Sequence, residues 1–103
     1  MEWRVFMMHE IREAFAFAAS GGIALHLMGD ITGDAFKNAP RVFKGRKFGH
    51  LFGPNREALT TAAVSLGCKP EWIQKVDDPK RMHFDLVGSR LERAKKLCTN
   101  LTS

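Results

Sequence analysis

The sequence has no apolar run that approaches the roughly 18 residues needed to span a bilayer. Its first residues lack the basic start of a signal peptide, and the charged residues Glu10, Arg12 and Glu13 follow too early for an apolar secretory segment. Repeats, low-complexity tracts and linkers are also absent. These absences predict one cytoplasmic domain over residues 1–103 with no membrane partner.

Cysteine is scarce, and the signatures of common nucleotide-binding folds are missing. Cys68 and Cys98 are the only two thiols, and a lone pair does not have the spacing of zinc ligands. We therefore expect both thiols to be buried core side chains. The chain has no P-loop, dinucleotide glycine fingerprint, helix-turn-helix or RNA-binding ribonucleoprotein motif.

What is present is the composition of a globular domain, with 45% hydrophobic and 26% charged residues. In three segments apolar residues recur every three or four positions next to glycine or proline, which predicts helices. They are Glu10–Ala19, Pro54–Leu66 and Ser89–Cys98. Pro54 suits the first position of its helix, and Ser89 and Glu92 have the spacing of a capping box.

Short apolar, aromatic or β-branched runs lie between the helices and predict strands. These runs are Trp3–Met8, Ile23–Met28, Arg41–Phe43, Lys47–Phe52, Trp72–Gln74 and Met82–Leu86. The alternation predicts an α/β fold, a small mixed sheet with packed helices in a single layered domain. Five large side chains are expected in its core: Leu59, Leu66, Trp72, Leu91 and Leu97.

Four short motifs follow one another in the second half of the chain: Gly45–Leu51, Leu66-Gly67, Glu71–Gln74 and His83–Leu86. Their order before a basic helix resembles the small bacterial and phage domain-of-unknown-function family numbered 4031, over residues 45–97. The resemblance implies a phage-like protein with a family-like core over residues 23–103 and an added N-terminal part over residues 1–22. It implies candidate positions but no activity.

The sequence departs from this family at three places. Phe84 stands where the family usually has tyrosine, and Ile73 where it usually has phenylalanine. The family's first strand tends to carry paired aspartates, whereas Asp30 is alone after Ile23–Met28.

The sharpest chemical pattern is His83-Phe84-Asp85. In a strand, residues two apart share a face, so His83 and Asp85 point together. An imidazole beside a carboxylate can bind a divalent metal or form an oriented general base. The alternative is structural, with His83 simply hydrogen-bonded and Asp85 capping a helix or pairing with arginine. As a site, the pair predicts a shared cleft that also admits His50 or Asp30.

A second group of ligand types is His26, Asp30 and Asp34. Carboxylates after a buried strand suit Mg²⁺ or Mn²⁺, which prefer oxygen ligands. The same Gly-Asp pairs are also ordinary turn residues. We name His83, Asp85, Asp30 and His50 as candidate metal ligands, with magnesium or manganese preferred to zinc.

Charge is unevenly distributed in a chain of net charge +5. Residues 37–56 hold six basic residues and no acidic one. Together with two arginines of the last predicted helix they form a candidate nucleic-acid-binding surface. Its members are Lys37, Arg41, Lys44, Arg46, Lys47, Arg56, Arg90 and Arg93. The alternative is a solvated basic face.

Three functional hypotheses follow. The first is a nucleic-acid-binding accessory protein that acts through the basic segment. The second is an enzyme, a metal-dependent hydrolase of a phosphodiester or nucleotide, with His83 and Asp85 as catalytic ligands or base. The third, a phage inhibitor of a host protein, is neither supported nor opposed by any motif.

Overall fold

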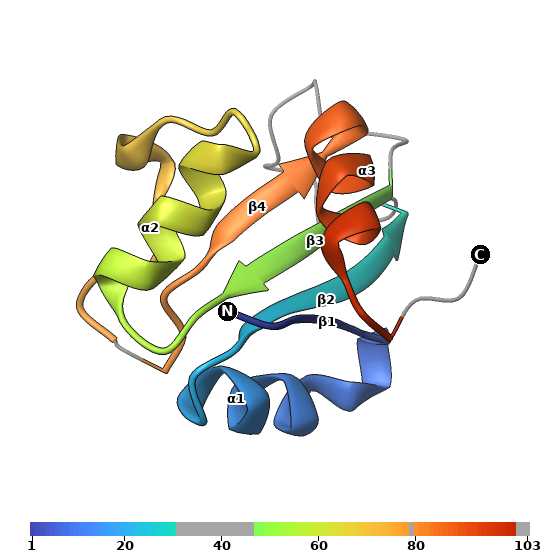
Figure 1. Ribbon diagram of the computed structural model, residues 1–103, viewed down its shortest axis with the longest axis horizontal. Helices are drawn as coiled ribbons and strands as arrows, with labels where there is room; N and C mark the ends of the chain where they lie inside the picture. Colours follow the sequence, from blue (N-terminus) through green and yellow to red (C-terminus); the bar gives the residue numbers. More distant parts are fainter. Residues whose placement is uncertain (31–46, 79, 101–103) are drawn as a thin grey trace.

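The computed structural model describes residues 1–30, 47–78 and 80–100 and shows a four-stranded mixed sheet with helices packed against it (Figure 1). The strands are β1 (Trp3–Phe6), β2 (Ile23–Asp30), β3 (Lys47–Phe52) and β4 (Phe84–Val87), in that spatial order. β1 runs parallel to β2, and the other neighbours are antiparallel. The predicted small mixed α/β sheet is confirmed.

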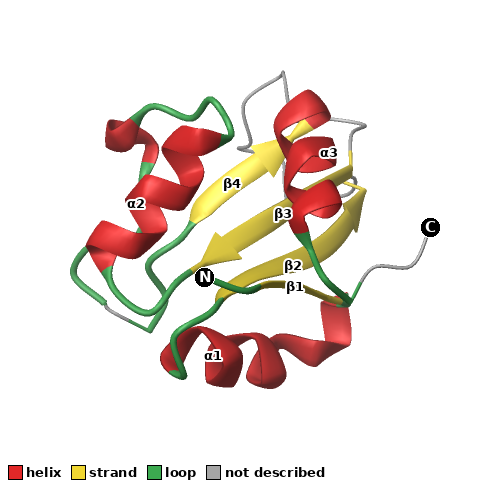
Figure 2. Ribbon diagram, viewed as in Figure 1, coloured by secondary structure: helices red, strands yellow, loops and turns green. Residues whose placement is uncertain are grey.

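Three α-helices and two short 3₁₀ helices complete the described part of the chain (Figure 2). The α-helices are α1 (Ile11–Ala19), α2 (Arg56–Ser65) and α3 (Gly88–Leu97). The 3₁₀ helices are η1 (Met8–Glu10) and η4 (Pro70–Trp72). No described helix is long and apolar enough to cross a membrane.

The sheet carries a separate apolar cluster on each face, because alternate residues of a strand point to opposite sides. On one face, which we call the closed face, Leu25, Leu51 and Leu86 pack with residues of α2 and α3. On the other face, the α1 face, Ala24 and Phe52 pack against α1. Gly49 has no side chain, and this lets Leu91 of α3 approach the closed face. A Cβ at this position would lie 3.1 Å from the His26 carbonyl oxygen and 3.2 Å from the Leu91 side chain.

The edge strand β1 is covered by the C-terminal part of the described chain. The Asn100 side chain accepts a hydrogen bond from the Val5 N–H at 2.8 Å and donates one to the Val5 carbonyl at 2.9 Å. The Thr99 N–H donates to the Trp3 carbonyl at 2.9 Å. These bonds satisfy backbone groups that an exposed edge strand would offer to another chain. Residues 1–22, expected as an addition to the core, supply β1 and α1.

Two helix starts differ from the prediction. Asn55, not Pro54, defines the start of α2: its side chain accepts a hydrogen bond from the Ala58 N–H at 2.8 Å, so the helix begins at Arg56. In α3 the expected capping box does not form, because β4 runs directly into the helix at Gly88 and Ser89 lies inside it. The positive φ of Gly88, 58°, permits this abrupt turn.

The predicted strand over Trp72–Gln74 is wrong. Pro70 lacks an N–H and begins the 3₁₀ helix η4 instead, so only Gln74 pairs, in an isolated bridge with His83. Of the five expected core side chains, Leu59, Leu66 and Leu91 are buried. Trp72 is 41% exposed: it ends the 3₁₀ helix η4, and its ring contacts the Arg90 guanidinium and not the core. Leu97 is 48% exposed in the last turn of α3. The predicted strand over Arg41–Phe43 lies outside the described residues.

Candidate metal centre

Strand pairing brings together three side chains that can bind a metal. The register of β3 and β4 sets His50 opposite Asp85, and His83 lies two residues before Asp85 on the same face. The Nε2 atoms of His50 and His83 each lie 3.3 Å from Asp85 Oδ1. One ligand atom from each residue lies within 4.8 Å of the other two. The expected proximity of His50 to the His-x-Asp pair is therefore observed.

The spacing of these atoms suits a shared metal ion. Ligands about 2.1 Å from an ion are about 3.0–3.4 Å apart when they are neighbours in octahedral or tetrahedral coordination. Both 3.3 Å separations fall in that range. The side chains of His50, His83 and Asp85 are 23%, 15% and 29% exposed, so the group is largely desolvated but still reachable.

A backbone hydrogen bond sets the tautomer of His83. Its Nδ1 lies 2.7 Å from the Arg81 carbonyl oxygen, which can only accept, so Nδ1 carries the proton. In the neutral ring Nε2 then keeps a lone pair that can bind a metal, and this atom lies 3.3 Å from Asp85 Oδ1. A carbonyl that orients a histidine in this way is the usual second partner of a metal ligand.

Asp85 Oδ1 is buried and has no well-aligned hydrogen-bond donor in the described part of the chain. The two imidazole nitrogens at 3.3 Å satisfy the distance of an ion pair, but their direction does not make a hydrogen bond. Buried oxygens without a donor are rare in folded proteins and mark places where water or an ion binds. Asp85 Oδ1 is also the atom that lies 3.3 Å from the Nε2 atoms of both His50 and His83.

The two histidines of the centre have opposite pKa shifts. Burial, together with the neighbouring His83, lowers the pKa of His50 to about 4, although Asp85 opposes the shift. Burial also disfavours protonation of His83, but its contacts with the Asp85 carboxylate and the Arg81 carbonyl outweigh burial and raise its pKa. His50 is thus a neutral imidazole at neutral pH, the form that binds metals.

His26 lies beside this centre but belongs to a different contact. It is the cross-strand neighbour of His50, with ring centroids 6.2 Å apart, and is only 2% exposed. Its Nε2 donates to the Met8 carbonyl at 2.9 Å, which leaves Nδ1 buried without a partner among the described residues. His26 therefore extends the polar strip of the α1 face but is not among the three grouped ligands.

The structure does not describe the side chain of Asp30, which was predicted to join the centre, or that of Asp34. Asp30 is the last residue of β2 and pairs in register with Lys47, but its side chain is outside the described part of the structure. Asp34 lies outside the described residues altogether. Among the described residues, the group brought together contains two imidazoles and one carboxylate. Magnesium and manganese were predicted ahead of zinc, but two imidazole ligands favour zinc or manganese over magnesium.

The predicted nucleic-acid-binding residues are distributed differently. Lys37, Arg41, Lys44 and Arg46 lie outside the described residues, as does the side chain of Lys47, and Arg56 is exposed at the start of α2. Arg90 donates to the Gly67 carbonyl and Arg93 to the Leu66 carbonyl, each at 3.1 Å. Both arginines thus bind the carbonyls at the end of α2, where cations are favoured.

The two cysteines are buried, as expected. Burial raises the pKa of Cys98 to about 11 and also raises that of Cys68, although Arg90 opposes the second shift. Neither thiol is activated as a nucleophile.

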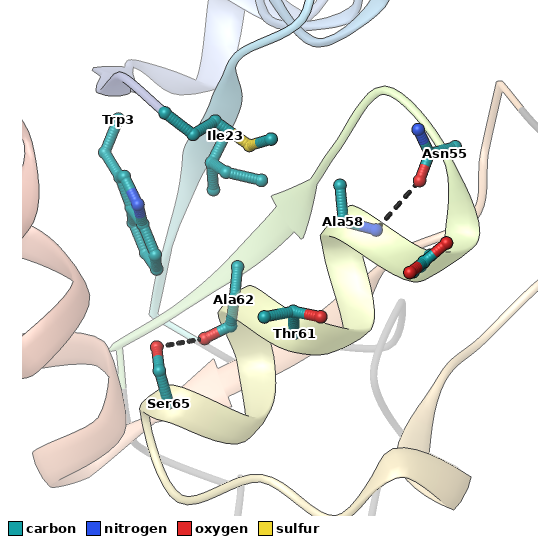
Figure 3. Close-up of a pocket in the computed structure, with 9 residues that line it drawn as sticks. Trp3, Ile23, Asn55, Ala58, Thr61, Ala62 and Ser65 are labelled. Atoms are coloured by element: carbon teal, nitrogen blue, oxygen red, sulfur yellow. Dashed lines mark hydrogen bonds between the residues drawn. The ribbon is translucent and has the colours of Figure 1, made fainter.

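A hollow of about 490 Å³ lies elsewhere, between β1, β2 and α2 (Figure 3). Its lining includes Trp3, Ile23 and Thr61. Two of its polar side chains are already used locally: Asn55 accepts from the Ala58 N–H, and the Ser65 hydroxyl donates to the Ala62 carbonyl. Because no group of ligand-type side chains converges there, the histidine–aspartate group is the stronger candidate site.

No protein-family model matches the sequence, and no solved structure matches the chain. The resemblance of residues 45–97 to the domain-of-unknown-function family stays a prediction, and the candidate site rests on the geometry described above.

Proposed function

We propose that the protein is a metal-dependent hydrolase of phosphate esters, of the phosphodiester or nucleotide type, in which His50, His83 and Asp85 hold one divalent transition-metal ion. The convergence of their ligand atoms within 4.8 Å is the observation that supports this proposal. Three protein ligands leave coordination positions for water and substrate, which is the usual design of a catalytic rather than a structural site.

The chemistry of this proposal follows from the donor set. A divalent ion held there would lower the pKa of a coordinated water and so would supply hydroxide near neutral pH. In the overall hydrolysis the water oxygen would bond to phosphorus and the ester P–O bond would break, with one water proton going to the leaving oxygen and the other to solvent or phosphate. His83, oriented by the Arg81 carbonyl, and Asp85 would hold the ion on the sheet. Phe48 and Phe52 flank His50, with ring centroids 5.5 and 5.9 Å away, and exclude bulk water from one side.

The first test is metal binding by isothermal titration calorimetry with Zn²⁺, Mn²⁺ and Mg²⁺. We expect one ion per chain, bound more tightly for zinc and manganese than for magnesium. His83→Ala and Asp85→Asn should each weaken binding by about 100-fold or more, because each removes a ligand. The matched control is His9→Ala, which removes an exposed histidine outside the group. Equal affinity in all four proteins would show that the group is not a metal site.

The second test is hydrolysis of bis(p-nitrophenyl) phosphate and p-nitrophenyl phosphate by the metal-loaded chain. Turnover should require the metal and should be lost in Asp85→Asn. A chain that binds metal at this group but hydrolyses neither ester would disprove the hydrolytic part of the proposal.

A second candidate, a nucleic-acid-binding accessory protein, is favoured by the absence of acidic residues among the six basic ones of residues 37–56. Its test is fluorescence anisotropy with single- and double-stranded oligonucleotides at several salt concentrations. Four to six phosphate contacts would give a log–log slope of about −3 to −5. Replacing Arg46 and Lys47 by alanine should flatten that slope by about two contacts' worth. No binding at about 50 mM salt would reject this candidate.

A further inference from the structure

Trp72 is an exposed aromatic ring with basic side chains held beside it. It ends η4 and is 41% exposed. The guanidinium carbon of Arg90 lies 5.0 Å from the centre of the indole ring, and the Nζ atom of Lys69 lies 6.0 Å from it. Both are cation–π contacts, in which the ring face attracts the cation. These contacts place two cations beside an indole ring that solvent still reaches.

A second arginine extends this group at the end of α2. Arg90 Nε donates to the Gly67 carbonyl and Arg93 Nη1 to the Leu66 carbonyl, each at 3.1 Å. A Cβ at Gly67 would lie 3.4 Å from Arg93 Nη1 and 3.6 Å from Arg90 Nε, so the two guanidinium groups lie close together at this glycine. We call the four side chains the indole–cation cluster: Lys69, Trp72, Arg90 and Arg93.

The positive charge of the cluster is not neutralised within the described part of the chain. No ion pair there includes Lys69, Arg90 or Arg93, and the exposed Glu71 of η4 pairs with none of them. Each arginine uses one nitrogen for a backbone carbonyl, which leaves its other N–H groups to donate elsewhere. A guanidinium held in this way is preorganised for a phosphate group.

We propose that the indole–cation cluster binds single-stranded nucleic acid, with phosphates on Lys69, Arg90 and Arg93 and a base stacked on the Trp72 ring. Basic side chains combined with an exposed aromatic ring are the usual means by which proteins bind single strands without reading their sequence. The bases of a duplex already stack on one another, so an exposed ring favours a single strand. An acidic peptide would use the cations of the cluster but not the ring.

The assignment does not rest on the proposed metal-dependent function, because no residue of the cluster belongs to the metal group. It shares its class of partner with the second candidate function but names a surface outside residues 37–56. The sequence predicts Arg90 and Arg93 as nucleic-acid contacts. Only the structure adds Lys69 and Trp72 to them.

The test is fluorescence anisotropy of labelled oligo-dT about 12 nucleotides long, within the usual site size of single-strand binders. EDTA is present, so that no metal ion contributes. The competitors are a strand of the same length without bases, the matching duplex, and a poly-glutamate peptide of equal charge. Trp72→Leu removes the ring and Trp72→Phe keeps one. Lys69→Ala and Lys96→Ala each remove one exposed lysine, so they are matched in net charge.

We expect Trp72→Leu to weaken oligo-dT binding by about fivefold or more, the low end of one base–aromatic stack, and Trp72→Phe to bind within about twofold of the unmodified chain. Lys69→Ala should flatten the log–log salt slope by about 0.7, which is one phosphate contact on a single strand, and Lys96→Ala should not change it. In a Trp3→Phe chain, where Trp72 is the only tryptophan, oligo-dT should quench the emission. All three competitors should bind more weakly than oligo-dT.

Each other outcome overturns a distinct claim. Equal affinity of Trp72→Leu and the unmodified chain, without quenching, would overturn base stacking on Trp72. Equal salt slopes in Lys69→Ala and Lys96→Ala would overturn the phosphate contact of Lys69. Poly-glutamate binding as tight as oligo-dT binding would overturn the nucleic-acid assignment in favour of an acidic protein segment.

Two results separate this surface from the functions proposed above. Binding that is lost when Arg46 and Lys47 are replaced by alanine, but is unchanged in Trp72→Leu and Lys69→Ala, would overturn the indole–cation cluster and leave the second candidate function standing. Failure of the unmodified chain to bind any oligonucleotide would overturn both and leave the metal centre untouched.

Discussion

The two faces of the sheet are built differently although the same strands supply both. On the closed face, Leu25, Leu51 and Phe84 are fully buried beneath α2 and α3. On the α1 face, an apolar cluster extends from β1 to β3, where α1 lies. Over β3 and β4 this face also carries the partly exposed polar side chains of His50, His83 and Asp85.

The closed face therefore stabilises the fold, and the α1 face carries the polar side chains that can bind an ion. Burial of large apolar side chains stabilises the closed face, and among the described residues its core cluster contains no histidine or carboxylate. The α1 face instead holds two buried polar atoms, His26 Nδ1 and Asp85 Oδ1, that have no hydrogen-bond partner among the described residues. Buried polar atoms without a partner destabilise the folded protein, and binding of an ion or a water to them removes that destabilisation.

The largest expected effect comes from breaking the closed face at Phe84. Phe84→Ala should lower the free energy of unfolding by about 3–5 kcal/mol, because it removes a fully buried ring and leaves a cavity. Its neighbour Asp85 points to the other face, and Asp85→Asn should change the metal-free stability by less than about 1 kcal/mol. Urea unfolding of both variants measures the contrast. Similar losses in the two would contradict the proposed division between faces.

Metal binding should stabilise the protein through the α1 face alone. At a free Zn²⁺ concentration about 100 times the dissociation constant, the free energy of unfolding should rise by about 2.7 kcal/mol. Leu86→Val, on the closed face, should lower the starting stability but keep this increment. Asp85→Asn should lose it. Thermal unfolding with and without Zn²⁺ tests the prediction, and an increment that survives in Asp85→Asn would place the ion elsewhere.

The pH dependence of the metal-free protein should separate the two histidines of the centre. Because the pKa of His83 lies above its ordinary value of 6.5, its protonation stabilises the fold below about pH 6.5, and this stability is lost as pH rises through the folded pKa. Because the pKa of His50 is lowered to about 4, its contribution is lost as pH falls from about 6.5 towards 4.

These two histidine titrations can be followed by NMR of the ring Cε1–H groups. His50 and His83 should titrate on opposite sides of 6.5, and Asp85→Asn should move the His83 midpoint down, because the carboxylate that favours its charged form is removed. Saturating Zn²⁺ should abolish both titrations. Coincident midpoints near 6.5 would show that the two rings do not share an environment with Asp85.

The smallest effect should come from loosening α2 while leaving the metal centre intact. Asn55→Ala removes the side-chain cap of the Ala58 N–H (Figure 3) and should lower stability by about 1 kcal/mol. Zn²⁺ affinity should stay the same, because α2 packs on the closed face. Asn55→Ser, which keeps an acceptor, should recover most of the loss. A change in Zn²⁺ affinity would show that the two faces are coupled.

Local patterns predicted much of the fold. Apolar periodicity and glycine boundaries identified α1, α2 and α3 to within a few residues. An apolar run bounded by glycines identified β2, and alternation identified β3. The errors fall where a neighbouring element overrides the local signal. Ser89 does not cap α3, because β4 joins the helix directly, and residues 70–72 form a 3₁₀ helix where a strand was expected from residue 72.

By itself the sequence determined that His83 and Asp85 share a strand face, because a strand repeats every two residues. It also supplied His50 as one of several candidates for the same site. Only the tertiary structure decided that His50 joins the pair, because the antiparallel register of β3 and β4 sets it opposite Asp85. The tautomer of His83 was likewise decided by folding, since it depends on a contact with the Arg81 backbone carbonyl that no side-chain pattern encodes.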